Sequence, residues 1–446
     1  MYEENLTSKI SKLIISSDPL INGTAIENAK IAFIDYLAVT FAVSNYNNIE
    51  VFNNILKESK DKNSIKVIGK GFKTDSLNSA LYNGFLGHYL DFDDVHEESR
   101  SHPSVVIFPA LLSLSLHRKY TFYEFLSAYV VGVETMVKLT KALGDNHYNK
   151  GWHNTSTIGV IAASAASSYL LKSSKDQVAT ALGIAATTAS GLRLQFGTEV
   201  KPLHAGLSSR SGVFAAQISL NNIKGSREVF DSQNNYLDVY SDFPMREKLI
   251  ESWGEPWAIT SPGLWFKKYP CCSASYHAID AIKSILKKAI VKIDDIEFIE
   301  VIYPPGGDEA LIYKTPQTPQ QGKFSVEYII AKCLVDGDVT INTFNGNSID
   351  GEIGSLMSKI RRVYDPTIKP EKDAIPQKRF TIIKLKLKDK MLESRVDYPL
   401  GSSKKPLTKG EVIQKFELIS KNKDLLLKEI LDSNEMTLLQ SIYNKI

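Results

Sequence analysis

The spacing of apolar residues changes twice along this 446-residue chain, and this change constrains the fold more than any single motif does. Up to about Lys267 the apolar residues recur at helical spacing. Residues 296–303 and 380–388 then show strand character, and the second segment alternates apolar residues with lysines. A chain this long exceeds one compact core. We therefore expect a mainly α-helical, discontinuous large domain from residues 1–267 and 399–446, and a smaller α+β lid domain from residues 268–398.

Helix-start signals support the helical assignment. The capping-box pattern of Ser or Thr followed three residues later by Glu or Gln begins at Thr24, Thr121, Ser174 and Thr408. In the lid, helices are predicted near residues 325–334 and 352–363, between the two strands.

Composition excludes several classes of partner. Lys and Arg total 53 against 50 Asp and Glu, which is too balanced for an electrostatic nucleic-acid binder. A small positive surplus favours anionic substrates only where it is focused in a cleft. The longest apolar stretch, residues 158–171, falls short of the roughly 20 residues that a membrane span needs. Three cysteines form no disulfide framework, and the N-terminus is acidic where a secretory signal is basic. We expect a cytoplasmic protein with no membrane or nucleic-acid partner.

Residues 88–104 concentrate titratable groups between two apolar helical segments. Three aspartates, three histidines and Arg100 lie there, between residues 76–90 and 105–116. Such a junction between buried helices can shift pKa values towards proton transfer. The residues alone leave two alternatives open: an acid–base site, or a solvated acidic loop with an aspartate that caps a helix.

Three further stretches, 151–155, 193–204 and 266–277, carry His, Lys, Arg or Cys next to predicted helices. Singly, each fits a capping histidine, a surface lysine or a core cysteine. Together they predict a ligand site, because clefts between domains commonly bind ligands. No Gly-rich phosphate loop and no His/Cys grouping with metal-ligand spacing occurs, so we expect neither an organic cofactor nor a metal.

Five motifs in this order resemble the MmgE/PrpD family, which contains 2-methylcitrate dehydratase, cis-aconitate decarboxylase and iminodisuccinate epimerase. They are His88-x-x-Asp91-Phe-Asp-Asp-x-His, His102-Pro-Ser, Gly151-Trp-His153, Lys201-Pro-Leu-His204-Ala-Gly and Tyr269-Pro-Cys-Cys-x-x-x-x-His277. The resemblance covers essentially the whole chain. It implies a helical large domain, an α+β lid, a homodimer and a reaction that needs no metal or organic cofactor.

The resemblance also implies a lyase that acts on small di- and tricarboxylates. Asp91, His102, His153, Lys201 and Lys267 match the family's catalytic residues. We expect His102 to transfer the proton and Asp91 to orient it. We expect Lys201 and Lys267 to bind carboxylates, with His153 assisting. The expected substrate-binding residues are Arg193, Gln195, His204, Lys268, Cys272 and Tyr313.

Two departures from the family pattern bear on the reaction. Val95 stands where many members have Thr, and Cys272 stands where decarboxylase-type members can carry His. Dehydration of 2-methylcitrate, a step of propionate catabolism, is therefore the first expectation. Cis-aconitate decarboxylation and iminodisuccinate-type epimerisation are the alternatives, and a catalytically silent dimeric binding protein is an alternative of another class.

Overall fold

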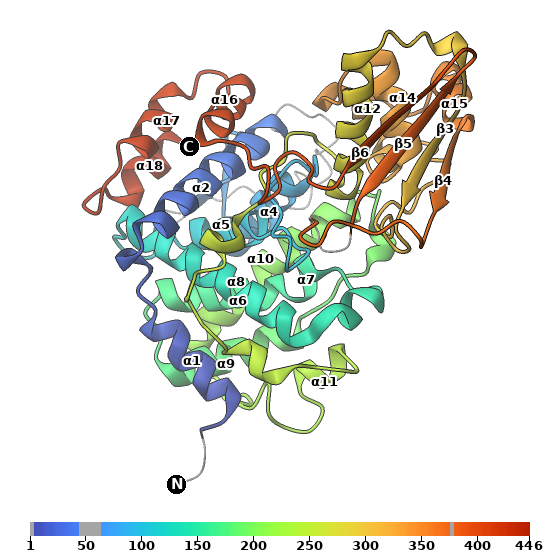
Figure 1. Cartoon of the computed structure of the whole chain (residues 1–446). Coiled ribbons are helices and arrows are strands. Elements are labelled where there is room, and N and C mark those ends of the chain that lie inside the picture. Colours follow the sequence, from blue (N-terminus) through green and yellow to red (C-terminus); the bar gives the residue numbers. More distant parts are fainter. Residues whose placement is uncertain (1–3, 44–63, 375–378) are drawn as a thin grey trace.

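The computed structural model describes residues 4–43, 64–374 and 379–446 (Figure 1). Helices dominate up to residue 267, with a short antiparallel pair, β1 (Ile65–Lys66) and β2 (Lys73–Thr74), between two of them. The helices are α1 (Leu6–Ser16), α2 (Gly23–Val43), α4 (Ser76–His88), α5 (Ser104–Ser113), α6 (Phe122–Asn149), α7 (Asn154–Thr157), α8 (Gly159–Leu170), α9 (Lys175–Thr187), α10 (Val200–Ser219) and α11 (Tyr236–Tyr240). None of the helices in these described ranges is long and apolar enough to cross a membrane.

The C-terminal segment lies against the N-terminal helices. It forms α16 (Lys409–Ile419), α17 (Asp424–Leu431) and α18 (Leu439–Lys445), and α16 packs on α2 (Figure 1). Val412 and Phe416 belong to the same apolar core as Phe33 and Phe108. We call residues 4–43, 64–267 and 399–446 the helical part.

Residues 269–374 and 379–398 form a second unit, here called the α+β part. A four-stranded sheet has the order β4-β3-β5-β6, with β3 (Ile296–Tyr303) parallel to β4 (Ile360–Tyr364) and antiparallel to β5 (Thr381–Leu387), which pairs with β6 (Met391–Val396). The helices of this part are α12 (Tyr276–Lys288), α13 (Pro319–Gly322), α14 (Val326–Asp336) and α15 (Gly351–Ser358). The sheet and its helices share a separate apolar core.

The spacing of apolar residues correctly predicted two of the four strands of this sheet. β3 and β5 confirm the two predicted strands, and Ile383, Leu385 and Leu387 are buried as their alternation predicted. The helix predicted over residues 352–363 is wrong in its second half, because α15 ends at Ser358 and residues from Ile360 pair with β3. We propose that the two parts are separate domains divided near residues 267 and 399.

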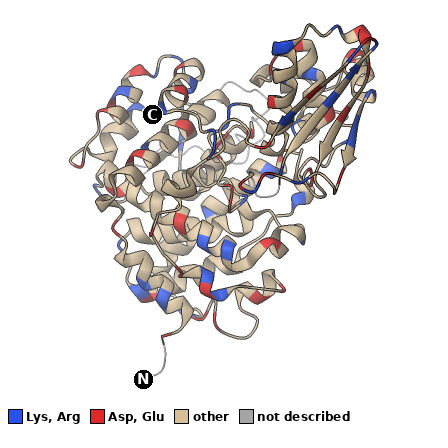
Figure 2. Cartoon of the chain, viewed as in Figure 1, with Lys and Arg blue, Asp and Glu red and all other residues tan. Residues whose placement is uncertain are grey.

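Charged residues are interspersed along both parts, in keeping with the balanced composition (Figure 2). One buried ion pair joins the C-terminal segment to the interior. Lys415 Nζ of α16 lies 2.8 Å from Asp35 Oδ1 of α2, and it also donates to the backbone oxygens of Phe92 (2.8 Å) and Lys267 (3.1 Å). Asp35 Oδ2 has no hydrogen-bond partner within the described structure. Lys415 therefore holds together three segments that are distant in sequence.

We expect Lys415→Met to destabilise the protein by about 3–5 kcal/mol, because it leaves the buried Asp35 carboxylate without its cation. Burial already raises the pKa of Asp35, so the loss should shrink as the pH falls and the folded protein takes up a proton there. Urea denaturation followed by circular dichroism at pH 8 and pH 6 measures both effects. The Asp35→Asn/Lys415→Met variant, which removes both charges, is expected to recover most of the loss. An equal loss in the double variant would show that the ion pair is not the cause.

Candidate active site

The helices α4 and α10 cross closely enough to bring their side chains together. Two glycines permit this approach: a Cβ at Gly206 would lie 2.1 Å from the Leu81 carbonyl oxygen, and a Cβ at Gly84 would lie 2.8 Å from Gly206 Cα. The last residue of α4 is His88 and the first turn of α10 contains Lys201. Lys201 Nζ therefore reaches His88 Nε2 at 2.7 Å.

The loop after α4 folds back on itself and delivers three further groups. Asp91 has a φ of 52°, a left-handed conformation that is uncommon for a residue other than glycine. His96 N donates to Ser101 O (3.0 Å), so the chain returns and places His102 at the start of α5. Val95 and Trp265 exchange backbone hydrogen bonds of 2.9 and 2.8 Å. This pairing brings Lys267, two residues after Trp265, alongside Asp91.

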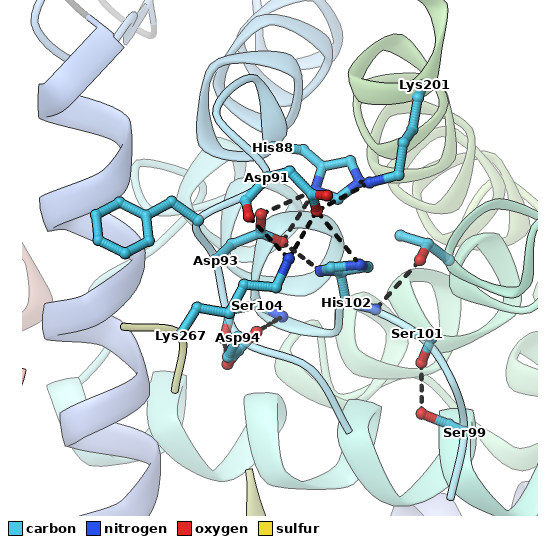
Figure 3. A network of polar contacts seen from close by, with 12 residues as sticks. His88, Asp91, Asp93, Asp94, Ser99, Ser101, His102, Ser104, Lys201 and Lys267 are labelled. Carbon is cyan, nitrogen blue, oxygen red and sulfur yellow. Dashed lines mark hydrogen bonds and ion pairs between the residues drawn. The ribbon is translucent and has the colours of Figure 1, made fainter. Parts of the chain in front are cut away.

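Asp91 lies between two buried ammonium groups (Figure 3). Its Oδ1 is 2.7 Å from Lys267 Nζ and 3.1 Å from Lys201 Nζ, and Lys267 also donates to the Asp91 backbone oxygen at 2.8 Å. Burial would raise the pKa of Asp91, but Lys201 and Lys267 outweigh it and hold that pKa well below its usual range. Burial opposes the charge of Lys267 as well, and Asp91 raises its pKa above the ordinary value. Both partners are therefore ionised.

Asp93 lies closer than Asp91 to the candidate catalytic histidine. Asp93 Oδ2 lies 2.9 Å from His102 Nδ1, whereas His102 Nε2 is 3.8 Å from Asp91 Oδ1. Asp93 also accepts from His88 Nδ1 at 2.9 Å (Figure 3). The expectation that Asp91 orients His102 stays a prediction, but the Asp91 carboxylate is held by the two lysines and is the more distant of the two from His102.

The surroundings fix the protonation of this cluster. Burial lowers the pKa of His88 to about 3 and also lowers that of His102, although Asp93 opposes the second shift. Burial opposes ionisation of Asp93, but His88 and His102 outweigh it and its pKa falls well below the usual range. An ionised Asp93 only accepts hydrogen bonds. The Asp93 charge 2.9 Å from His102 Nδ1 favours a proton on that nitrogen, which leaves Nε2 free to accept one. This contact is one of distance and charge, because Nδ1 forms no hydrogen bond within the described structure.

A cavity of about 70 Å³ adjoins the cluster, where the helical and α+β parts meet. At roughly 10–15 Å³ per water, it has room for about five water molecules, which suits a small molecule. Asp91, His102, His153, Lys201 and Lys267 all line it, so the five residues predicted to be catalytic lie together. Among the predicted substrate-binding residues, Cys272 also lines the cavity.

Other predicted substrate-binding residues lie outside the cavity wall. His204 Nδ1 is 3.2 Å from His153 Nδ1 and supports it from behind. The Arg193 guanidinium donates to the backbone oxygens of Tyr148 and Glu309, and the Gln195 side chain accepts from the Thr198 hydroxyl. Tyr313 of the α+β part donates to Phe196 O at 3.2 Å, which joins the two parts. These contacts make Arg193 and Tyr313 part of the junction and not part of the cavity wall.

Lys268 does not line this cavity, so its role in substrate binding stays a prediction without support from the geometry. The paired segment is extended, so successive side chains point to opposite sides. Trp265 and Lys267 face inwards and are buried, whereas Lys268 is exposed.

Sequence reasoning missed several residues of the site. His88 and Asp93 lie in the titratable segment, but no role was predicted for either residue. Their spacing to Asp91 in the chain was the signal that could have identified them. Arg100, Tyr148 and Arg379 line the cavity and carried no recognisable motif.

The cluster contains a grouping that the sequence spacing did not reveal. One ligand-type atom from each of His88, Asp91, Asp93 and His102 lies within 4.8 Å of the others, close enough in principle for a metal ion. Two of these residues are already occupied by ammonium groups, since Lys201 contacts both His88 and Asp91 and Lys267 contacts Asp91. The donor set therefore fits internal pairing with lysine better than metal coordination.

Comparisons with known proteins bear on this site. The family model of the MmgE/PrpD N-terminal domain matches residues 4–247, and that of the MmgE/PrpD C-terminal domain matches residues 269–423. The chain is 26% identical over 411 residues to a cis-aconitate decarboxylase of Mus musculus, covering 88% of this chain and 81% of that protein. It is 27% identical over 351 residues to the Homo sapiens cis-aconitate decarboxylase, covering 76% and 71%. It is 22% identical over 426 residues to that of Aspergillus terreus, covering 90% and 86%. The two family models together span most of the sequence, and the chain belongs to the MmgE/PrpD family.

Proposed function

We propose that this protein is a lyase of small polycarboxylates that needs no cofactor, and that it decarboxylates cis-aconitate or a close analogue. The observation that carries the proposal is the Asp93–His102 pair, which faces a small cavity lined by Lys201 and Lys267. The named relatives, all cis-aconitate decarboxylases, favour this reaction. Dehydration of 2-methylcitrate, the first expectation from the sequence, finds no such support and takes second place.

The inference from Cys272 against decarboxylation was too strong. Burial raises the pKa of this thiol, so Cys272 is uncharged at neutral pH. The side chain therefore changes the shape and hydrogen bonding of the cavity wall and adds no charge that would oppose the departure of CO₂.

Decarboxylation of such a substrate needs charge stabilisation and one proton. The carbon–carbon bond to the departing carboxylate breaks, and its electron pair forms a new double bond to the neighbouring carbon. The electron pair of the original double bond is released to its far carbon, which gains the proton. The developing carbanion lies beside a carboxylate, so preorganised cations lower the barrier. Lys201 and Lys267 supply that charge from the cavity wall. His102 is the group that we assign to proton transfer.

Substrate binding adjusts His102 to this task. In the free protein, burial keeps its pKa below the ordinary value and the imidazole is neutral at pH 7. A bound polycarboxylate adds negative charge beside Nε2, which raises the pKa and favours proton uptake. The proton that His102 takes up is then available for the substrate carbon. His153 also lines the cavity, and we assign it to holding the substrate.

A catalytically silent binding protein fits these observations less well. Lys267 is fully buried and Lys201 nearly so, and buried charges are costly unless they are paired or used. A silent protein has no need to keep both ammonium groups at a cavity wall.

The direct test is a substrate panel. The purified protein is incubated with cis-aconitate, 2-methylcitrate, citrate and an iminodisuccinate, and CO₂ release, unsaturated product and inversion are followed in parallel. We expect CO₂ from cis-aconitate. Water loss from 2-methylcitrate without CO₂ release from cis-aconitate would instead establish the dehydratase, and binding without turnover would establish the silent protein.

We expect activity to survive exhaustive chelation, because the Lys201 ammonium group already contacts both Asp91 and His88. Turnover is measured after dialysis against EDTA, with the metal content checked by elemental analysis. Activity that disappears and returns on addition of zinc or iron would contradict this expectation and assign the four-residue cluster to a metal.

A homodimer and a cytoplasmic location remain proposals that rest on the family. Light scattering coupled to size-exclusion chromatography tests the first of these.

A further inference from the structure

The cavity wall carries a second pair of cations, Arg100 and Arg379, in addition to Lys201 and Lys267. Arg100, from the loop before His102, lines the cavity together with Tyr148 and with Arg379, which precedes β5 in the α+β part. Four lysine and arginine side chains border the cavity against two carboxylates, Asp91 and Glu97. The small positive surplus of the whole chain is thus concentrated here.

Neither of these carboxylates neutralises the second pair of cations. Asp91 is held by the two lysines. The Glu97 carboxylate accepts from the backbone N (3.2 Å) and Oγ (3.1 Å) of Ser403, and burial raises its pKa. These contacts direct Glu97 towards the C-terminal segment.

The two arginines are weakly paired within the described structure. Arg100 has one ion pair, 3.2 Å from Asp145, whose side chain is 77% exposed and therefore contributes little. Arg379 is half-buried, and no described residue forms a hydrogen bond or an ion pair with it. Burial lowers the pKa of Arg379, and the like charge of Arg100 lowers it further. Two like charges that border one small cavity stabilise the protein best when an anion lies between them.

We propose that Arg100 and Arg379 form a second carboxylate subsite, which binds a substrate carboxylate remote from the reacting carbon. This inference rests on the proposed function. A guanidinium holds a carboxylate through two parallel hydrogen bonds, which fixes orientation as well as charge. Burial raises the pKa of Tyr148, so its hydroxyl stays protonated and can donate to the same carboxylate.

The subsite gives the enzyme a means of selecting its substrate class. A carboxylate at Lys201 and Lys267 and another at Arg100 and Arg379 must belong to one molecule. Because Arg379 comes from the α+β part and the other three come from the helical part, such a ligand bridges the two. Substrates with carboxylates at both ends are favoured over those that have lost the remote one.

The test compares two inert ligands by calorimetry. Propane-1,2,3-tricarboxylate carries the remote carboxylate, and 2-methylsuccinate is the same molecule with a hydrogen atom in place of that carboxylate. Arg379→Gln is expected to weaken the tricarboxylate by about 10- to 100-fold and to change the dicarboxylate by less than about twofold, since charged hydrogen bonds contribute that much. Arg361→Gln, an exposed β4 arginine that pairs with Glu300, should leave both affinities unchanged. If Arg379→Gln fails to fold, Arg379→Lys keeps the charge, loses the paired geometry and should show a smaller loss in the same direction.

The outcomes separate the two proposals. Equal affinities of the wild type and the Arg379 variant for the tricarboxylate, or equal losses for both ligands, would overturn the subsite and leave the proposed function standing. Failure of the wild type to bind either ligand would overturn the proposed function and the subsite with it.

Discussion

Replacement of His102 by Gln is expected to lower turnover by about 10²- to 10⁴-fold while an inert tricarboxylate still binds, because general acid–base catalysis typically contributes that much. The side chain borders the cavity, and the Asp93 charge beside Nδ1 favours a proton there, so we assign the exchange of a proton with substrate to Nε2. Glutamine retains a polar group of similar length but cannot take up or release a proton near neutral pH. Binding should persist because Lys201 and Lys267 remain.

A matched control separates chemistry from packing. His96 lies in the same loop, is fully buried and contacts Ala258 O through Nε2 at 3.2 Å, but it does not line the cavity. His96→Gln should therefore cost stability and leave turnover within a few-fold. If His102 merely begins a helix, His102→Gln should behave in the same way, with a loss of about 1 kcal/mol. A His102→Gln protein with a lowered melting temperature and near-normal turnover would refute the catalytic role.

The helix-start signals show how much of the fold the local sequence predicts. The capping boxes at Thr121, Ser174 and Thr408 are formed as predicted. The one predicted at Thr24 is wrong, since α2 already begins at Gly23 and the Asn22 side chain accepts from Ala25 N. Asn is as good a cap as Thr, and the competing residue stood two positions earlier. Capping chemistry therefore predicts that a helix begins, and neighbouring polar residues decide where.

The strands depend on long-range pairing, which a local stretch of sequence does not predict. β4 and β6 were not predicted, and both are defined by their partners β3 and β5. The residues of β4 follow α15 with no glycine or proline between them, so helical spacing runs on into the strand. Pairing with a strand some 60 residues earlier decides the outcome, and no window of sequence contains that information.

The sequence predicted which residues belong to the site, but it did not predict which of them contact one another. The five residues that the motifs predicted to be catalytic line one cavity, but the motifs did not predict that Asp93 is the carboxylate nearer to His102. Asp91 and Asp93 lie in an irregular loop, where no regular spacing predicts the direction in which a side chain points. The left-handed backbone at Asp91 and the pairing of Val95 with Trp265 decide which carboxylate meets the lysines and which meets His102.

Asp93→Asn is expected to lower turnover by about as much as His102→Gln does, which makes Asp93 a sharp test of this network. The Asp93 carboxylate is fully buried and accepts from His88, with His102 Nδ1 at 2.9 Å. Asparagine has the same shape but turns an NH₂ group towards one imidazole, which favours the tautomer of His102 with its proton on Nε2. In a serine protease triad, the corresponding change lowers kcat by about 10⁴-fold.

The pH profile gives a readout that a purely structural role would not change. Asp93 raises the pKa of His102 against the effect of burial, so removal of its charge should lower that pKa further. Protonation of His102 then requires a lower pH, and the corresponding limb of the kcat profile should move in the acidic direction. Asp94→Asn is the matched control, because burial raises the pKa of Asp94 to about 8 and the group is already largely protonated at pH 7.

The double variant decides whether Asp93 acts through His102. Residues that work as one unit are strongly non-additive, so His102→Gln/Asp93→Asn should turn over about as slowly as His102→Gln alone. If instead the two losses multiply, Asp93 stabilises the transition state independently of His102. If Asp93→Asn is nearly as active as the wild type while Asp91→Asn is not, the orienting carboxylate is Asp91 after all, and the 2.9 Å contact between Asp93 and His102 has no catalytic role.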